Sequence, residues 1–328
     1  MALQRDTLYA GRFSTATSSH PQGAFKNRTT STAQDGSYLE AQWLNDWDGF
    51  FGSLLSKAGL TPDGNVDAVG ASQYFNALLT VASVAPVGTS RNLKCSVTTA
   101  STTATFTADE LVLGTALNGQ KYHISSLSAS VSLTTTGAGG MDTGSAPVSG
   151  YVAIYAILNP TTGSSGLLGV NATSAVVPEV YGGSHLPSGY TASALIAVWP
   201  TNSGGQFIIG RWLNRSFRRD QINVLASSSQ LLSYTALSVS SVVPINAKII
   251  DVHISPYQTT SANGCQIYVA GDSLGMDLVT STAAVSGVTN SQSVATKLIS
   301  ITTPQTLYYK LQAVGTYSYQ VNINGYDI

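Results

Sequence analysis

Charged side chains are scarce in this chain. Lysine, arginine, aspartate and glutamate together make up 9% of its 328 residues, and the formal net charge is -1. A chain so close to neutrality has no overall electrostatic attraction for nucleic acid or for an anionic membrane. The scarcity also favours neutral strands and turns over solvated amphipathic helices. Any partner must therefore be recognised by a local group of side chains.

Cysteine and histidine are also rare. The two cysteines, Cys95 and Cys265, lie far apart in strand-like segments, so we predict two buried free thiols rather than a disulfide framework. No histidine has a second ligand at metal-binding spacing. We therefore expect no metal and no other cofactor. The four histidines are His20, His123, His185 and His253.

Long hydrophobic runs are missing as well. The longest apolar run, residues 151–158, is far shorter than the roughly 18 residues that span a bilayer. The first residues lack the apolar region of a secretory signal peptide. We expect the chain to fold in the cytoplasm of the cell that makes it, without membrane insertion.

The first 36 residues show no sustained hydrophobic period. They are rich in glycine, serine, threonine and asparagine, and they carry four basic residues, Arg5, Arg12, Lys26 and Arg28. Such a segment buries no core alone and orders only against a partner. We predict that residues 1–36 form an extended attachment arm, which could reach about 3.3 Å per residue.

A helical hairpin is predicted over residues 37–88. Residues 37–40 read Ser-Tyr-Leu-Glu, the form of a capping box at a helix start, and Gly59 is a plausible stop. A turn at residues 61–64 leads to a second, shorter helix that contains Tyr74. Between the start and the stop, apolar residues recur at three- and four-residue steps: Leu39, Trp43, Trp47, Phe50, Phe51, Leu54, Leu55 and Ala58.

This apolar stripe holds more aromatic area than one short partner helix easily covers. Two interpretations are open. A second copy of the chain completes the core, or the stripe packs on the β-domain of its own chain. Either way, we predict that Trp43 and Trp47 are buried.

Beyond residue 86 the pattern indicates strands. Apolar and polar residues alternate in residues 126–133, 250–254 and 317–324, whereas residues 151–158 and 194–199 are typical of central strands covered on both faces. No fixed repeat suggests a β-helix or a propeller. We predict a mostly β chain in which the arm and the hairpin precede two antiparallel, sandwich-like β-domains. These domains are expected at residues 89–215 and 216–328.

Four basic residues gather at the expected boundary between these domains: Arg211, Arg215, Arg218 and Arg219. Arginine at such a junction pairs with carbonyls or carboxylates of a neighbouring domain or subunit, and this is the interpretation we favour. The alternative is that the cluster pairs with acidic sugars.

Catalytic constellations are hard to find. A glycan hydrolase needs paired carboxylates about 5 to 10 Å apart. The only suggestive pair in the C-terminal block is Asp272 and Asp277, and turns favour aspartate for backbone reasons alone. The glycine-rich residues 137–140 lack the Lys-Ser/Thr of a phosphate loop and precede no helix. We therefore expect that the protein is not an enzyme.

Two stretches resemble proteins of tailed bacteriophages. Residues 20–82, with PQGAFKNR at 21–28, WLNDW at 43–47, GFF at 49–51 and GASQY at 70–74, resemble the N-terminal region of tail-fibre and tail proteins of phages and prophages. Residues 91–210 are similar to a β-domain of the same proteins, through GAGGMDTGSAPVSG at 137–150 and PEVYGG at 178–183. Residues 216–328 match nothing that we recognise.

The resemblance implies a non-enzymatic virion component, commonly homotrimeric, that links the tail or baseplate to a variable tip. The tip would bind a glycan or protein of the host surface. Virion attachment is then expected at Arg5, Arg12, Phe25, Lys26 and Arg28. Receptor contact is expected at tyrosines of the last domain, whose rings can stack on sugars: Tyr257, Tyr308 and Tyr326.

Two other functions remain open. A purely architectural tail, collar or baseplate fibre would use its C-terminal domain to contact virion proteins. A glycan-degrading enzyme is disfavoured by the missing acid pairs.

Overall fold

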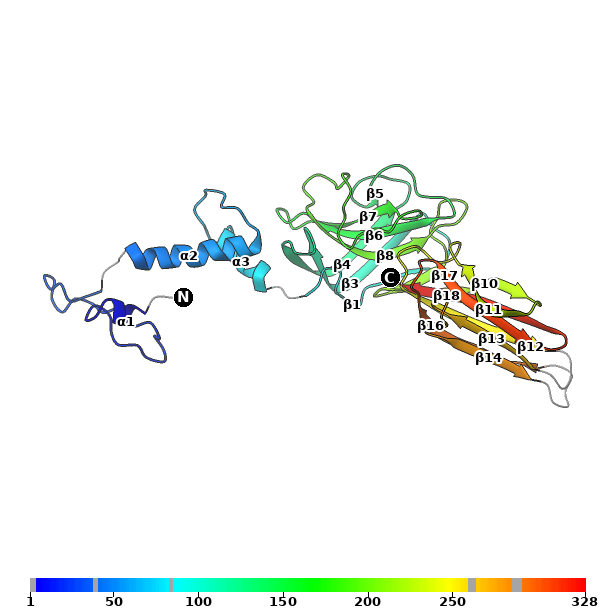
Figure 1. Cartoon of the computed structure of the whole chain (residues 1–328). Coiled ribbons are helices and arrows are strands. Elements are labelled where there is room, and N and C mark those ends of the chain that lie inside the picture. Colours follow the sequence, from blue (N-terminus) through cyan, green and yellow to red (C-terminus); the bar gives the residue numbers. More distant parts are fainter. Residues whose placement is uncertain (1–3, 38–40, 83–84, 259–263, 285–290) are drawn as a thin grey trace. The chain divides into compact units, whose positions relative to one another are not determined.

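The computed structural model describes residues 4–37, 41–82, 85–258, 264–284 and 291–328. Within these residues the chain is mostly β, as predicted, and it divides into two compact units between residues 84 and 85 (Figure 1). Below, they are called the N-terminal unit and the β unit, and each is described by itself.

The N-terminal unit contains the predicted helical hairpin. Helix α1 (Arg5–Leu8) is a single turn, and α2 (Ala41–Ala58) and α3 (Gln73–Ala82) are the two arms of the hairpin. Helix α2 ends where expected, since Gly59 has a φ of 71° and the amide of Leu60 donates to the carbonyl of Leu55. Leu55, Ala58 and Ala77 form the small buried core between the helices.

The start of α2 is only partly described. Residues 38–40 of the expected capping box, including Leu39 of the apolar stripe, lie outside the described residues. The hydroxyl of Ser37 serves another role: it donates to the carbonyl of Arg12 and accepts from the amide of Lys26. Ser37 therefore fastens the preceding loop.

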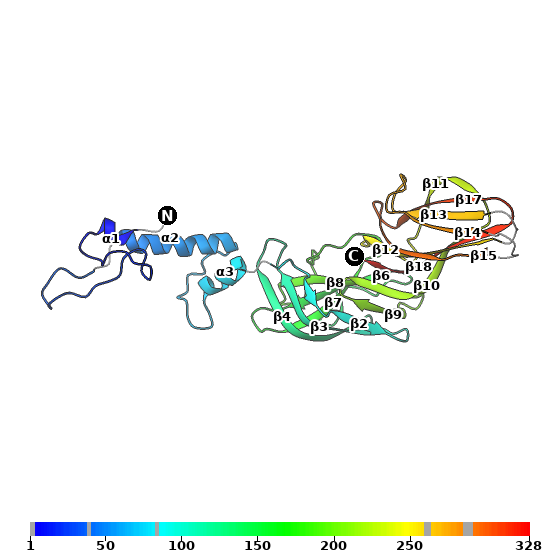
Figure 2. The same cartoon turned by 90° about the horizontal axis from the view of Figure 1, so that it is seen from below.

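Residues 4–37 are not extended, and here the prediction of an extended arm is wrong. The segment turns back on itself, so that the amide of Arg5 donates to Gln22 and the amide of Ser14 donates to Ala24 (Figure 2). Phe13, only 5% exposed, forms an isolated bridge with Phe25. Burial of aromatic rings compensates for the missing hydrophobic period.

Two sheets make up the β unit. The larger has 14 strands in the order β15-β12-β18-β10-β9-β2-β3-β8-β6-β7-β5, with β1 and β4 also paired to β3, and β16 to β12. The smaller sheet has the order β11-β17-β13-β14. Neighbouring strands pair antiparallel except β5 and β7.

The strands of the larger sheet are β1 (Ser90–Arg91), β2 (Lys94–Val97), β3 (Thr103–Gly114), β4 (Lys121–Ser132), β5 (Gly140–Met141), β6 (Tyr151–Leu158), β7 (Ser165–Asn171), β8 (Ala192–Pro200), β9 (Gly210–Leu213), β10 (Ser216–Ser227), β12 (Ile249–Gln258), β15 (Ser291–Gln292), β16 (Ala295–Ser300) and β18 (Tyr317–Asp327). Those of the smaller sheet are β11 (Leu231–Ser238), β13 (Gly264–Ala270), β14 (Val279–Ala284) and β17 (Thr306–Ala313).

Strands β6 and β8 are buried along their whole length, which confirms the prediction from their continuous apolar runs. Alternate residues enter two different cores. Ile154 and Trp199 belong to the larger one, whereas Tyr155 and Val198 belong to the smaller one. The larger core also includes Leu311 of the smaller sheet, so both sheets are covered by a shared set of apolar side chains.

The expected boundary at residue 215 does not separate two compact units. Strands β9 and β10 form a tight hairpin across it, with Trp212 opposite Phe217, and β10 continues into pairing with β18. The larger sheet therefore continues through this hairpin from one expected domain into the next. Both rings are fully buried. The division into 89–215 and 216–328 is corrected accordingly.

Gly325 tests the packing of β18 on this hairpin. A Cβ atom at this position would overlap the carbonyl oxygen of Phe217, which is backbone and cannot swing away. We expect Gly325→Ala to lower the free energy of unfolding by about 1 to 3 kcal/mol in a denaturant titration. Gly264→Ala is the matched control, because the nearest atom to its Cβ would lie 3.6 Å away. Equal stability of the two variants would contradict the described packing.

Candidate functional sites

A continuous row of aromatic rings runs through the N-terminal unit. Neighbouring ring centroids lie between 4.6 and 6.3 Å apart, in edge-on or tilted arrangements. This aromatic row consists, in order, of Tyr9, Phe13, Phe25, Trp43, Trp47, Phe51 and Tyr74. It joins the folded arm to α2 and α2 to α3.

Arg5 lies at the centre of the arm end of this row. Its guanidinium carbon is 5.6 Å from the ring centre of Phe13, 5.2 Å from that of Phe25 and 5.6 Å from that of Trp43. The same guanidinium donates a hydrogen bond to the carbonyl of Gly23. Arg5 thus stabilises the arm against α2 by cation–π contact.

The other residues expected to attach the virion are dispersed. Lys26 donates to the carbonyl of Gly11 at 2.7 Å, Phe25 is 52% exposed, and Arg28 is exposed beside Gly36. Arg12 supplies the carbonyl that accepts from Ser37. The structure brings Arg5 and Phe25 into direct contact, and Ser37 links the backbones of Arg12 and Lys26.

The apolar stripe of α2 is only half covered. Trp43 is 8% exposed, as predicted, but Trp47 is 51% and Phe50 is 62% exposed, so the prediction of a buried Trp47 is wrong for a single chain. Phe51 and Leu54 are half-buried. Helix α3 adds exposed apolar residues of its own: Phe75, Leu78 and Leu79.

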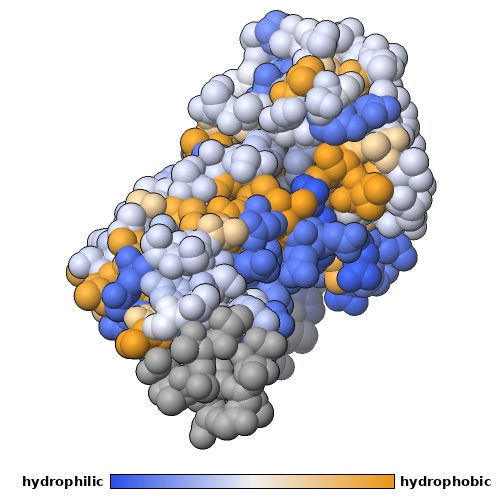
Figure 3. All heavy atoms as spheres, turned by 90° about the vertical axis from the view of Figure 1, so that its right-hand side faces the viewer, coloured by the Kyte–Doolittle hydropathy of each residue, from blue (hydrophilic) through white to orange (hydrophobic). Residues whose placement is uncertain are grey.

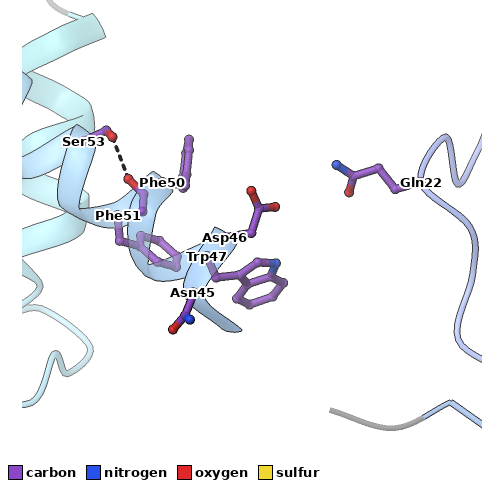
Figure 4. Close-up of a pocket in the computed structure, with 8 residues that line it drawn as sticks. Gln22, Asn45, Asp46, Trp47, Phe50, Phe51 and Ser53 are labelled. Atoms are coloured by element: carbon purple, nitrogen blue, oxygen red, sulfur yellow. Dashed lines mark hydrogen bonds between the residues drawn. The ribbon is translucent and has the colours of Figure 1, made fainter. Parts of the chain in front are cut away.

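A hollow of about 680 Å³ opens beside the exposed part of the stripe (Figure 4). Trp47, Phe50 and Phe51 supply aromatic walls, and Asp46 points toward the side on which Gln22 lies. The hydroxyl of Ser53 donates to the carbonyl of Gly49 at 2.6 Å, so it is occupied within the helix. The lining combines apolar area with a polar rim, as is typical of ligand pockets.

The basic residues near the β9–β10 hairpin differ in their surroundings. Arg215 donates to both carboxylate oxygens of Glu179, at 2.7 and 3.0 Å, and to the carbonyl of Ile328. Arg218 pairs with Asp327 at 2.8 Å and Asp251 at 3.4 Å. Both bind partners in their own chain, far away in sequence.

The remaining two basic residues behave otherwise. Arg211 is exposed on β9. Arg219 is half-buried, its Nε has no hydrogen-bond partner, and among the described residues it has no ion pair. Sequence alone could not separate it from Arg215 and Arg218.

Tyr326 cannot contact a receptor in this fold. Its ring is fully buried, its hydroxyl donates to the carbonyl of Val198 at 2.6 Å, and burial raises its pKa well above the ordinary value. Tyr257 and Tyr308 are half-buried on β12 and β17. The expectation for Tyr326 is overturned because β18 changes the face of its side chains at a bulge near Asn324.

Asp272 and Asp277, the acidic pair of the C-terminal block, accept hydrogen bonds from backbone amides. Asp272 accepts from the amides of Leu274 and Met276, whereas Asp277 accepts from the amide of Ser300 and pairs with Lys297 at 2.7 Å. Each carboxylate is thus engaged in local structure.

Metal and thiol chemistry find little support. No group of three possible metal ligands occurs in the part of the chain that the structure describes. Cys95 and Cys265 are buried free thiols, as predicted, and burial raises the pKa of Cys95 to about 12. His123 lies 3.3 Å from Glu110 on the neighbouring strand.

Across the described residues, no helix is long and apolar enough to cross a membrane.

Comparisons with known proteins do not assign a family. No family model matches the chain, and no curated protein matches it. One solved structure, a chain from the crystal structure of the IBDV viral particle, aligns over 72% of this chain and 69% of its own, with 13% identity and a TM-score of 0.18. A likeness this weak carries no argument about fold or function.

The Asp277–Lys297 pair predicts a pH dependence of stability. The hydrogen bond from Lys297 and the amide of Ser300 hold the pKa of Asp277 below its ordinary value. The folded state therefore gains stability from the charged carboxylate above about pH 4, and this gain is lost as the pH falls through the lowered pKa. In denaturant titrations, Asp277→Asn should lower stability at pH 7, and this loss should shrink as the pH falls below about 4.

Lys297→Met is the companion variant for this prediction. It removes the partner and should reduce the pH-dependent part of the Asp277 contribution. A loss on Asp277→Asn that is the same at pH 7 and pH 2 would assign the effect to packing instead.

Proposed function

We propose that the chain is a tail-fibre or receptor-binding virion protein of a tailed bacteriophage, without enzymatic activity. In this proposal the N-terminal unit attaches to the tail or baseplate, and the C-terminal part of the β unit contacts the host surface. The proposal includes a homotrimer whose β unit is sandwich-like in its C-terminal part. Several copies on one virion would raise the overall binding strength without new contacts.

The observation that carries the proposal is the uncovered apolar face of the N-terminal unit. Trp47 and Phe50 on α2 and Phe75, Leu78 and Leu79 on α3 are all between 49% and 62% exposed. Soluble monomers rarely leave so many large apolar side chains in water on so small a unit. A partner surface would bury these side chains. In a symmetric homo-oligomer, further copies of the same chain supply that surface.

The surface of the β unit supports contact by weak local recognition. Figure 3 shows a band of apolar side chains between hydrophilic areas on one face of the molecule. Exposed apolar residues of the C-terminal part include Leu232, Leu274, Met276 and Val314. With a net charge of -1, the chain has no global field to steer a partner.

A purely architectural fibre is the second candidate. In that case the uncovered face of the N-terminal unit would serve assembly alone, and the C-terminal part of the β unit would contact virion proteins rather than the host. The two candidates differ in whether the chain binds cells.

The first test concerns the oligomer. The protein should have the mass of a trimer in light scattering at micromolar concentration. The double variant Trp47→Ser/Phe50→Ser should shift the mass toward that of the monomer, because it lacks two exposed rings that would pack against the neighbouring copies. Leu117→Ser is the control, since Leu117 is 62% exposed in the β unit. A monomeric parent would contradict the trimer, and an unchanged mass of the double variant would remove α2 from its interface.

The second test separates the two ends. A fluorescently labelled full-length chain should bind cells of the host strain and compete with virions for adsorption. A chain lacking residues 1–28 should keep this binding but fail to enter particles, because Arg5, Phe13 and Phe25 of the folded arm are then missing. Incorporation without cell binding would favour the architectural fibre instead.

A further inference from the structure

Strand β10 carries a wide bulge opposite β18. Arg218 pairs with Gly325 and Ile222 pairs with Ile323, so three residues of β10 stand opposite the single residue Asn324. Arg219, Asp220 and Gln221 therefore leave the regular ladder. Bulges redirect side chains, and they are common beside functional sites.

The bulge places an unpaired cation in a partly buried position. Arg219 is half-buried, its Nε is inaccessible to water, and no hydrogen bond to its side chain is formed among the described residues. Burial lowers the pKa of Arg219, but a guanidinium stays charged at neutral pH. The charge of the neighbouring Asp220 offsets part of the cost of burying this guanidinium, and a ligand carboxylate that accepts its hydrogen bonds would offset more of that cost.

Arg219 is one of the residues that line a hollow of about 320 Å³. Its size falls at the lower end of the range typical of small-ligand sites. Asn202, in the loop that follows β8, also lines the hollow, and the amides of Gly204 and Gln206 donate to its side chain and fix its position. The lining residues are Ala100, Asn202, Ile208, Ile209, Arg219 and Asp220.

The lining selects a particular chemistry. A guanidinium binds a carboxylate through two parallel hydrogen bonds. The exposed Asp220 repels a bare anion but accepts hydrogen bonds from hydroxyl groups. Ile208 and Ile209 offer apolar surface to a carbon skeleton. A ligand that carries a carboxylate, several hydroxyls and a carbon face in a small volume is an acidic sugar.

We propose that this hollow binds a carboxylate-bearing sugar of the uronic acid class, with Arg219 as the group that binds the carboxylate. The inference deepens the proposed function and rests on it, since it names the type of host glycan that the β unit would recognise. Asp220 accepts hydrogen bonds from the sugar hydroxyls. The side-chain nitrogen of Asn202 donates to Gln206 and keeps a second N–H for a sugar oxygen.

The direct test is ligand binding to the full-length protein. Glucuronate should give saturation-transfer NMR signals and a measurable dissociation constant, whereas glucose and acetate should bind at least tenfold more weakly. Arg219→Gln should weaken glucuronate binding by about tenfold or more, because two charge-assisted hydrogen bonds are lost. Arg211→Gln, an exposed arginine on the neighbouring strand, should leave it within twofold.

Several results would overturn the inference. Equal binding of glucuronate by the parent and Arg219→Gln, or no binding to the parent, removes the site. Acetate that binds as tightly as glucuronate reduces it to an anion site without sugar recognition. A lower oligomer mass of Arg219→Gln in light scattering, with sugar binding unchanged, assigns the arginine to a carboxylate of a second copy.

Cell binding distinguishes this inference from the proposed function. If the labelled parent binds host cells and Arg219→Gln binds them equally, the proposed function stands and the acidic-sugar site fails. If glucuronate binding depends on Arg219 but the parent binds no cells, the site stands and host attachment fails. Retained thermal stability of Arg219→Gln excludes unfolding as the cause of lost binding.

Discussion

The β unit depends on the burial of the β9–β10 hairpin against its neighbours. The ring of Phe217 lies 5.0 Å from that of Trp199 and 5.2 Å from that of Tyr326, and the indole of Trp212 donates to the carbonyl of Asn214 inside the hairpin. Tyr326 lies more than a hundred residues beyond the other three rings in the sequence. Removing any of them would open a cavity where the sheet passes from its first half to its second.

The hairpin also organises the charges of the unit. Only 9% of the residues are charged, yet two arginines of the hairpin region form ion pairs: Arg215 with Glu179, and Arg218 with Asp327. Both ion pairs are partly exposed, so each adds little to the free energy of unfolding. Each nevertheless holds together two segments that are far apart in the sequence. Burial raises the pKa of Asp251 there, and Arg218 opposes the rise.

The sequence predicted the regular elements well where one period persists. The hairpin helices, the fully buried strands β6 and β8 and the alternation along β4 and the first part of β18 all follow from the spacing of apolar residues. Errors arise where the period breaks. Along β18 the odd-numbered Tyr319, Val321 and Ile323 are buried, and a bulge then turns the even-numbered Tyr326 inward.

Two other errors have a different cause. A basic segment between strand-rich blocks indicated a boundary at residue 215, but it is the turn of a hairpin whose rings are buried by strands far away in sequence. The arm lacked a period, yet Phe13 and Phe25 meet across a loop and Arg5 stacks on both. Long-range contacts of this kind leave no local pattern, because the partners are distant in sequence.

For the same reason, the sequence could not indicate which arginine belongs to the candidate sugar site. The sequence grouped Arg219 with three other arginines, and only pairing in space shows which of them are neutralised. The irregularity that turns Tyr326 inward also removes Arg219 from the regular pairing of β10 with β18, so one bulge affects both an expected contact residue and an unexpected one. What separates Arg219 from the exposed Arg211 is partial burial beside a hollow, and neither property can be read from the sequence.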